Sequence, residues 1–310
     1  MVPSTLKGPG WRARTASHAE ELAQGAVWSG YAVGSEVGRL AAVLLTWPDD
    51  GLAFAGLPGD WLMDARPDLA RMREEAAAIG TFYESMGVRV HWIRPVGAAP
   101  PNLVFVRDLF VMTPEGAVLG RMAAQQRAGE ERWAACALAD AGVPILATPR
   151  GHATLEGADV LWAAPDVVLV GLGNRTDEEG LRTVGRVLAD QGVRTLGVRL
   201  PARVQHLLGS VNFVSARRCV GFDCTPSIRA ALAELDVELL EFPDTDEVVR
   251  GRALNFVTLG PDEVVMPAGA PRTRARLEAA GVECHTLEVS QYLRAAGGLG
   301  CLTGILARGA

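Results

Sequence analysis

A cysteine that follows three closely spaced glycines is the first candidate for chemistry in this chain. Cys301 ends the run Gly297-Gly298-Leu299-Gly300-Cys301, a glycine-rich turn that enters an apolar strand. Glycine lets the backbone approach a ligand closely, and a thiolate beside exposed backbone N–H groups is a better nucleophile than a thiol buried in a core. The same position also suits a small residue that packs at the start of a strand. A nucleophilic thiol further requires a partner for proton transfer.

A histidine and three carboxylates supply candidate partners. His206 is one of five histidines and lies in the connection 204–210 between two apolar segments. Closed α/β folds gather their binding residues in such connections. Asp108, Glu156 and Asp159 interrupt apolar stretches, where an unpaired charge is costly, so we expect ion-pair or ligand-binding roles. The alternatives are a solvated loop histidine and, for Asp159, a carboxylate that accepts backbone N–H bonds at a strand start.

Composition and charge limit the classes of partner. The 310 residues are 49% hydrophobic and 21% charged, which is typical of a globular protein with a substantial core. A net charge of −6 without a dense Lys/Arg block argues against nucleic acid or an anionic membrane surface and favours a small cationic substrate. Residues 1–10 lack the apolar region of an export signal, and the first long apolar run, 40–47, is too short to span a bilayer. We therefore expect a cytoplasmic protein.

The sequence predicts neither a metal nor a cofactor. It contains no HExxH, CxxC or His-x-His pattern, and Gly171-Leu172-Gly173 lacks the third glycine of a dinucleotide-binding loop. Five cysteines in a chain of this length are too few and too scattered for a disulfide scaffold, so most are expected to be small buried residues.

A repeated pattern of elements must position these groups. A helical segment ends and a strand begins at Gly87, Gly142, Gly192, Asp236 and Gly281, and glycine suits the left-handed residue that stops a helix. The intervals predict five units of strand, strand, helix and strand, at about 38–92, 103–148, 158–198, 210–242 and 254–287. One unit cannot bury both faces of its sheet, which favours stacking around an axis over an ordinary α/β sandwich. We expect an N-terminal extension at 1–35 and a single domain at 36–310.

Five ordered segments resemble motifs of the guanidino-group-modifying superfamily, which comprises arginine deiminases, amidinotransferases and dimethylarginine dimethylaminohydrolases. The resemblance runs from about Gly38 to the C-terminus. The resemblance implies a fold of the α/β class, namely a five-bladed α/β-propeller of ββαβ units known as the pentein fold. The motifs are Phe105-Val106-Arg107-Asp108, Glu156-Gly157-Ala158-Asp159, Gly173-Asn174-Arg175-Thr176, His206-Leu207 and the glycine-rich turn to Cys301.

The resemblance also implies a role for each matching residue. Cys301 would attack the guanidinium carbon and form a covalent thiouronium, while His206 would protonate the departing amine and then activate water. Glu156 would orient the imidazole and favour its protonated form. Further implied substrate contacts are Asp108 on the guanidinium N–H groups, Phe105 on its plane, Arg127 and Arg175 on a substrate carboxylate, and Asn102 near the amino-acid end.

Two departures from the family pattern refine the expectation. Leu208 stands where deiminases and amidinotransferases carry a second aspartate, and His206–Ser210 resembles the dimethylarginine hydrolase branch, whose pocket is left free for N-alkyl groups. Ala158 replaces a usual second glycine and adds a methyl group near Glu156.

The sequence therefore predicts a cysteine-dependent hydrolase of a C–N bond in a linear amidine. It would act on an N-methylated arginine such as dimethylarginine and release citrulline and an alkylamine. The alternatives are an arginine deiminase or amidinotransferase of the same superfamily and, in another class, a non-catalytic ribosome-binding factor of the same fold. The expected partner is a small guanidino substrate. The oligomeric state stays open, with a homodimer among the possibilities.

Overall fold

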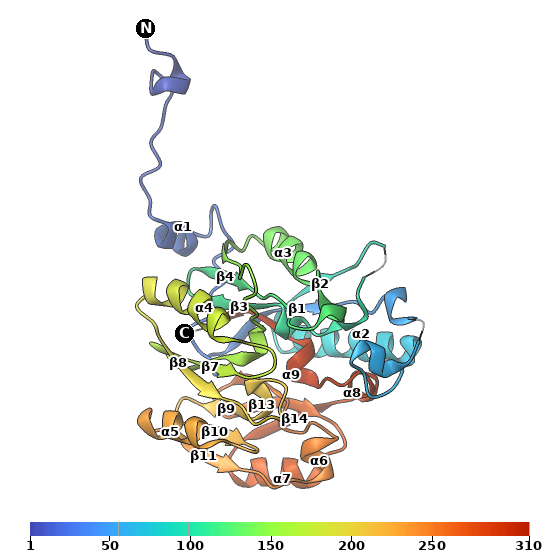
Figure 1. The fold of residues 1–310 in the computed structure, drawn as a ribbon. Helices are drawn as coiled ribbons and strands as arrows, with labels where there is room; N and C mark the ends of the chain where they lie inside the picture. Colours follow the sequence, from blue (N-terminus) through green and yellow to red (C-terminus); the bar gives the residue numbers. More distant parts are fainter. Residues whose placement is uncertain (55, 98, 310) are drawn as a thin grey trace.

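The strands of the described part of the chain form five three-stranded sheets. The computed structural model describes residues 1–54, 56–97 and 99–309, so residues 55, 98 and 310 of the predicted domain lie outside it. In each sheet the central strand pairs in parallel with one edge strand, to which a helix connects it. It pairs antiparallel with the other edge strand. The pattern of five repeated units is confirmed, and it forms the α/β-propeller that the resemblance implied (Figure 1).

Four of the units follow the chain in the predicted order of strand, strand, helix and strand. The inner strands are almost entirely buried, and the last strand of each unit is more exposed. The units are β3 (Phe110–Thr113), β4 (Gly116–Leu119), α3 (Glu131–Asp140) and β5 (Ile145–Ala147); β6 (Val160–Ala164), β7 (Val167–Leu172), α4 (Glu178–Asp190) and β8 (Arg194–Arg199); β9 (Val211–Ser215), β10 (Arg218–Gly221), α5 (Pro226–Glu234) and β11 (Glu238–Glu241); and β12 (Val257–Gly260), β13 (Glu263–Pro267), α7 (Pro271–Ala279) and β14 (Glu283–Leu287).

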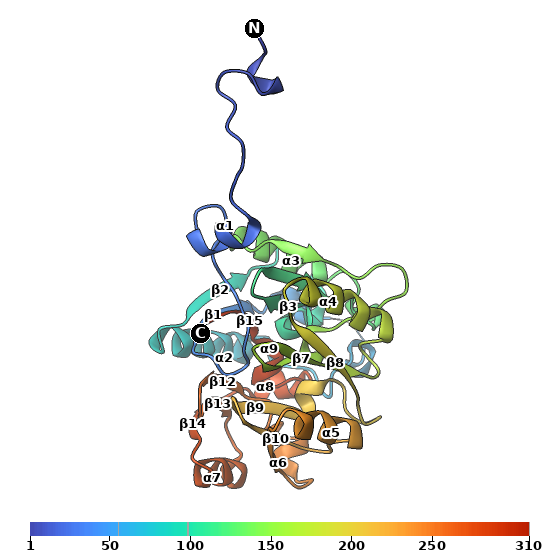
Figure 2. The same cartoon turned by 90° about the vertical axis from the view of Figure 1, so that its left-hand side faces the viewer.

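The first unit corrects the prediction for residues 38–92. That segment holds only two strands of its sheet, β1 (Leu40–Thr46) and β2 (Arg89–Ile93), joined through α2 (Leu69–Ser85). The third strand is β15 (Gly304–Arg308), which pairs antiparallel with β1 across the length of the chain. The two ends of the repeat therefore close the ring, as the blue and red ribbons side by side show in Figures 1 and 2.

The helix-to-strand boundaries confirm the predicted backbone geometry. Gly87, Gly142, Gly192 and Gly281 have φ of 77°, 73°, 76° and 86°, and Asp236 has φ of 53°. These values lie in the left-handed region, where glycine has no Cβ penalty and aspartate is better tolerated than most residues. Each of these residues lies two positions after the last residue of its helix, and the next strand begins two or three residues further on.

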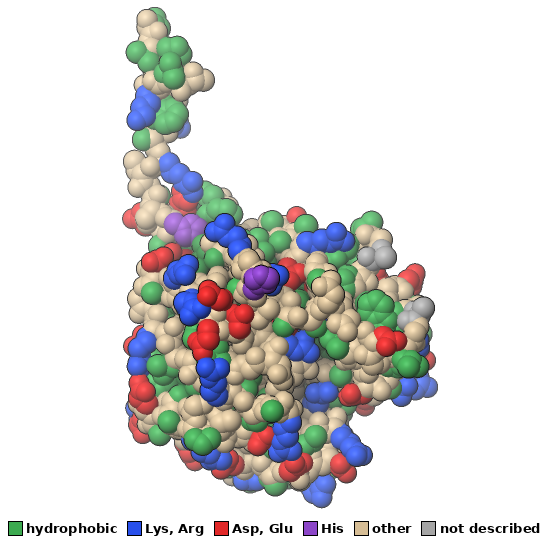
Figure 3. Space-filling model, viewed as in Figure 1, with side chains coloured by type: hydrophobic (Ala, Val, Ile, Leu, Met, Phe, Trp, Pro, Cys, Tyr) green, Lys and Arg blue, Asp and Glu red, His purple; other side chains and the backbone are tan. Residues whose placement is uncertain are grey.

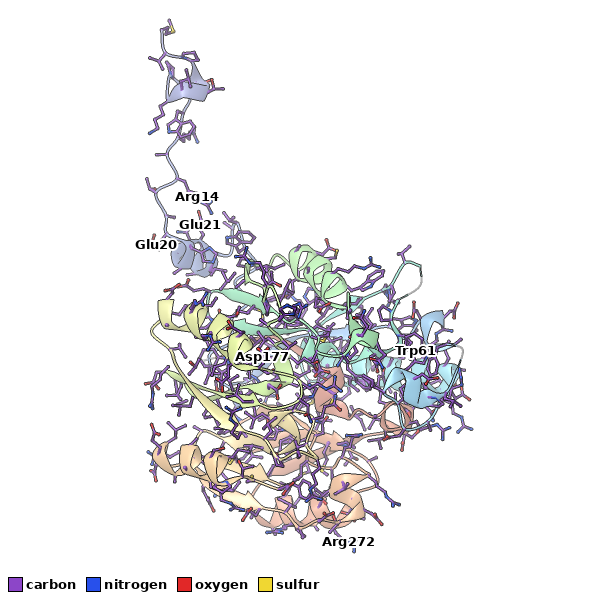
Figure 4. All side chains as sticks on the ribbon, in the orientation of Figure 1. Arg14, Glu20, Glu21, Trp61, Asp177 and Arg272 are labelled. Carbon is purple, nitrogen blue, oxygen red and sulfur yellow. The ribbon has the colours of Figure 1, made fainter. Side chains whose placement is uncertain are left out.

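The N-terminal residues divide into an arm and a packed segment. Residues 1–16 project away from the body, while α1 (His18–Gln24) lies against it (Figures 1 and 2). Ser17 and Glu20 form a capping box at the start of α1, and Arg14 pairs with Glu21 at the foot of the arm (Figure 4). Downstream, the Ser29 N–H donates to Gly142 O, which ties this segment to the body.

Acidic and basic side chains are interspersed on the face shown in Figure 3. Such a surface lacks the continuous basic patch on which nucleic-acid binding depends. Within the described residues, no helix combines the length and apolar character needed to cross a bilayer.

Candidate active site

Cys301 lies in a short helix, which corrects the prediction that its turn leads directly into a strand. This helix, α9 (Leu299–Leu302), precedes β15. The Cys301 N–H donates to Asn255 Oδ1 at 3.0 Å, and the Gly300 N–H donates to Asn255 O at 3.0 Å. The glycines are required by space, since a Cβ on Gly297 would come within 2.0 Å of the Phe105 ring. The turn therefore holds the thiol in place through Asn255 and brings the backbone close to Phe105.

His206 meets two of the predicted carboxylates. Its Nε2 lies 2.7 Å from Glu156 Oε2, and its Nδ1 lies 3.8 Å from Asp108 Oδ1. All three side chains are buried. The following segment is anchored by Asp159, whose Oδ1 accepts the Leu207 N–H at 2.9 Å. Asp159 thus takes the structural role that the sequence left open, and it also fixes the backbone that carries the histidine.

The charges around His206 set its protonation state. Burial on its own would lower the pKa of His206, but the carboxylates of Asp108, Glu156 and Asp159 raise this pKa to about 9. For Glu156, burial would raise the pKa, but the hydrogen bond and charge of His206 and the nearby arginines lower it to about 2. At neutral pH the pair is therefore an imidazolium held by a carboxylate.

The surroundings of Cys301 favour its neutral form, whereas those of His206 favour its charged form. Burial of the Cys301 thiol raises its pKa above the ordinary value, and the Asp108 carboxylate raises it further, while the Gly298 hydrogen bond, Arg252 and Asn255 oppose the shift. At neutral pH the resting site therefore holds a neutral thiol beside a protonated imidazole. A cation that binds next to the thiol would lower the pKa of Cys301, since opposite charge favours the thiolate.

Arg127 forms the centre of a buried ion network. Its Nη1 donates to Asp108 Oδ2 at 2.5 Å and lies 3.6 Å from Glu156 Oε2, and its Nη2 donates to Glu130 Oε2 at 2.8 Å. The side chain is 2% exposed, so this arginine is buried among carboxylates and not solvated. In this arrangement protein carboxylates take its donors. The contact with a substrate carboxylate implied by the resemblance stays a prediction.

We expect Arg127→Met to destabilise the fold strongly, because it leaves the carboxylates of Asp108, Glu130 and Glu156 buried with one cation fewer. Breaking a buried ion pair by removing one partner costs about 3–5 kcal/mol in the free energy of unfolding. Urea unfolding at pH 7 measures this cost. Arg194→Met is the matched control, since it breaks a single ion pair with Glu234 whose two side chains are each 53% exposed. Equal midpoints for the two variants would contradict the prediction.

The remaining predicted residues line a small cavity. Asn102, Phe105 and Arg175 border it together with Asp108 and Cys301. Arg175 Nη1 donates to Glu156 Oε1 at 3.4 Å, and Asn102 Nδ2 donates to Trp61 O at 2.8 Å. The buried Oδ1 of Asp108 has no hydrogen-bond partner, so a donor in this cavity would satisfy it. The structure thus brings all eight predicted residues into one region around Cys301.

Three buried side chains could also present ligands to a metal ion. One donor atom each from Asp108, Glu156 and His206 lie within 4.8 Å of one another. Metal binding requires a deprotonated imidazole, and the pKa of about 9 for His206 means that a proton competes for it at neutral pH. The arrangement therefore fits a charged acid–base pair better than a metal site.

Several residues of the site were not predicted from the sequence. Asn255, Glu130 and Thr176 hold the backbone of Cys301, the Arg127 guanidinium and the Asp159 carboxylate, respectively. Arg252 was missed as well, although its charge acts on Cys301. Asn255 interrupts an apolar run between Leu254 and Phe256, so the criterion that selected Asp108 would have found it. Glu130 and Arg252 stand in ordinary polar or charged surroundings and give no comparable signal, whereas Thr176 belongs to the motif Gly173-Asn174-Arg175-Thr176 but had no role assigned to it.

Comparisons with known proteins agree with this architecture. The arginine deiminase family matches residues 90–206. An uncharacterised protein of Aeropyrum pernix is 32% identical over 239 residues, which cover 74% of this chain and 83% of that protein. An arginine deiminase of Mycobacterium avium is 28% identical over 90% of this chain and 73% of its own length. The solved structure of a Pseudomonas aeruginosa dimethylarginine dimethylaminohydrolase mutant complexed with citrulline has a TM-score of 0.72 and 23% identity, covering 87% of this chain and 99% of that one.

The fold is thus that of the five-unit α/β proteins, with a candidate site where the connections of several units meet at Cys301. The chain belongs to the guanidino-group-modifying superfamily of arginine deiminases, amidinotransferases and dimethylarginine dimethylaminohydrolases.

Proposed function

We propose that this protein is a cysteine-dependent hydrolase that converts an N-methylated arginine, such as dimethylarginine, to citrulline and an alkylamine. One observation carries the proposal. Cys301 and His206 line the same cavity, and the buried Asp108 Oδ1 without a partner lies 3.8 Å from His206 Nδ1. A nucleophile, an acid–base group and an acceptor for a cationic N–H therefore converge, with residues 36–310 as the catalytic domain.

The residues divide the reaction between them. The Cys301 thiolate attacks the guanidinium carbon, which forms a C–S bond, and the C–N bond to the departing amine then breaks as His206 gives that nitrogen its proton. Water next adds to the thiouronium carbon, loses a proton to His206 and displaces the thiolate, leaving citrulline. Glu156 holds the imidazolium through the 2.7 Å contact, and Asp108 binds the guanidinium N–H groups.

The apolar wall beside the histidine favours a substituted guanidinium. Leu208 is buried and lines the cavity that contains Cys301 and His206. A second carboxylate at this position would lose hydration against N-methyl groups without gaining a hydrogen bond from them. An unsubstituted guanidinium would instead leave two N–H donors facing a leucine. This contrast is the reason to place N-methylated arginine ahead of arginine.

The other end of the substrate would extend into the small cavity. Phe105 would pack on the guanidinium plane, while Asn102 and Arg175 would take the amino-acid end. Arg175 suits a carboxylate because its ion pair with Glu156 uses Nη1 and leaves further guanidinium N–H donors. Leu62 also lines this cavity, whose volume is only about 20 Å³, so the cavity must widen for the amino-acid end of arginine to fit.

A product assay on purified protein tests the proposal. Arginine, monomethylarginine and dimethylarginine are incubated separately, and citrulline, ammonia and alkylamine are each quantified. We expect kcat/KM for a methylated arginine to exceed that for arginine by about tenfold or more, as for a methyl group recognised by an apolar wall. Equal or faster citrulline release from arginine would indicate a deiminase. Amidine transfer to an added amine, without hydrolysis, would indicate an amidinotransferase, and absence of any product would favour a non-catalytic binder.

A further inference from the structure

A second and much larger cavity opens beside the same thiol. Its volume is about 700 Å³, which falls in the range of sites for drug-sized ligands. Cys301, Gln205 and Ala296 line both cavities, so the two meet at the nucleophile. Most of the remaining lining of the larger cavity comes from the segments 203–209 and 248–255.

The division of side chains between the cavities orients a bound guanidinium. Asp108 and Phe105 border only the small cavity, whereas His206 and Leu208 border only the large one. The group that protonates the leaving nitrogen must stand within hydrogen-bond reach of it. The departing amine therefore faces the large cavity, and the retained part of the substrate occupies the small one.

The large cavity exceeds what a methylated amine needs. Dimethylamine has three non-hydrogen atoms and would fill roughly 90 Å³, at about 30 Å³ for each. The cavity of about 700 Å³ would then keep most of its space empty or hydrated. Apolar walls that stay in contact with water gain no transfer free energy, so a substituent that covered them would bind more tightly.

The lining indicates the chemistry of such a substituent. Val204, Leu208, Phe222, Val248 and Leu254 provide apolar walls next to His206. Three arginines line the same space and retain N–H donors beyond their ion pairs. These are Arg203, which donates through Nε to Asp223 and Nη1 to Asp244; Arg250, whose Nε lies 3.7 Å from Asp246; and Arg252, whose Nη2 lies 3.5 Å from Asp64.

Arg252 stands in strained backbone at this wall. Its φ of 47° lies in the left-handed region, which is sterically unfavourable for a non-glycine residue. Backbone strain of this kind concentrates at ligand-binding and catalytic positions. The strained residue stands at the cavity wall, where its side chain, 31% exposed, carries charge toward Cys301.

We propose that the large cavity binds the departing amine of an Nω-substituted arginine whose substituent is a long apolar chain ending in a carboxylate. This inference rests on the proposed hydrolase function and extends its substrate class. The balance is Nω-R-arginine plus water giving citrulline plus R-NH₂. The C–N bond to the substituted nitrogen breaks, His206 supplies the proton that nitrogen takes up, and the oxygen of citrulline comes from water.

A substrate series tests the inference. Nω-methyl-, Nω-hexyl- and Nω-carboxypentyl-L-arginine are compared by citrulline release under identical conditions. We expect kcat/KM for the carboxypentyl compound to exceed that for the methyl compound by about tenfold or more, with the hexyl compound between them. A carboxypentyl compound turned over more slowly than the methyl one would overturn the inference and leave the hydrolase proposal intact. Equal values for hexyl and carboxypentyl would overturn the acidic end. If no compound is hydrolysed, both proposals fail.

Two variants with matched controls separate cavity binding from general effects. Val249 lines the cavity and is 42% exposed, so Val249→Trp fills space without disturbing the core. Arg250→Glu reverses charge at a side chain that is 85% exposed. Each should lower the ratio of carboxypentyl to methyl kcat/KM by about tenfold. Val96→Trp, at an 87% exposed residue outside the lining, and Arg217→Glu, at a 79% exposed side chain, should leave this ratio unchanged. An unchanged ratio in both cavity variants would overturn the inference.

Discussion

Cys301→Ser should abolish citrulline formation while leaving substrate binding and the fold in place. A serine hydroxyl keeps the size of the side chain, so the hydrogen bond from the residue 301 N–H to Asn255 is retained. Its much higher pKa, however, leaves no adequate nucleophile for a delocalised cation. We expect the rate of citrulline release to fall by about 10,000-fold or more, as for loss of a covalent nucleophile in other hydrolases. Isothermal titration with dimethylarginine should still detect binding.

The five cysteines allow a sharp control for this prediction. Cys219, Cys224 and Cys284 are buried, and Cys136 is exposed. Cys136→Ser should therefore remove fast background alkylation by iodoacetamide and keep full activity. In that background, a guanidino substrate analogue should slow labelling of Cys301. Citrulline release from Cys301→Ser within about tenfold of the unmodified protein would show that another group performs the attack.

The sequence predicted the individual strands and helices better than the strand pairing that closes the ring. The units at 158–198, 210–242 and 254–287 were read correctly because buried strands are continuous apolar runs and their helices end at left-handed residues such as Gly192. The pairing of β15 with β1 was not predicted. Residues from the two ends of the chain meet there, and the sequence of neither strand indicates which strand it pairs with.

In the candidate site, too, the sequence indicated which residues need a partner but not which residues those partners are. Asp108 and Glu156 were found because a carboxylate within an apolar stretch requires a partner. Their actual partners come from elsewhere in the chain, since Arg127 joins the two and Glu130 joins Arg127. Whether an arginine faces solvent, a substrate or three buried carboxylates depends on packing between units. For this reason only the resemblance assigned Arg127 to a substrate carboxylate; its ion pairs with Asp108, Glu130 and Glu156 were not predicted.

The protonation states predict an unusual pH dependence. Near neutral pH the site holds a thiol and an imidazolium, which is one proton more than the reactive thiolate–imidazolium pair. The excess proton must leave before attack. Since the pKa of Cys301 is raised and that of His206 is about 9, kcat/KM should rise about tenfold per pH unit and level off near pH 9. This rising limb of the pH profile reports the ionisation of the free protein, because a guanidinium substrate stays cationic throughout the range.

Glu156→Gln should move that limb to lower pH. The Glu156 carboxylate helps to hold the pKa of His206 at about 9 against burial, which acts to lower it. Removing this charge lowers the pKa of His206, so the plateau begins at a lower pH. The plateau value should also fall by about 100-fold or more, because the imidazolium loses the negative charge that stabilises it and keeps at most a neutral hydrogen bond to the amide oxygen. A pH series of kcat/KM, with the His206 proton signal followed by NMR, measures both effects.

The ion pair of His285 with Glu263 provides the matched control for this experiment. Their Nε2 and Oε1 atoms lie 3.1 Å apart in partly exposed positions on β13 and β14. Glu263→Gln removes the same kind of contact, but its histidine borders neither cavity at Cys301. We therefore expect its pH profile to match that of the unmodified protein. If Glu156→Gln keeps its limb near pH 9, the carboxylate does not control His206, and the imidazolium must be held by Asp108 and Asp159 instead.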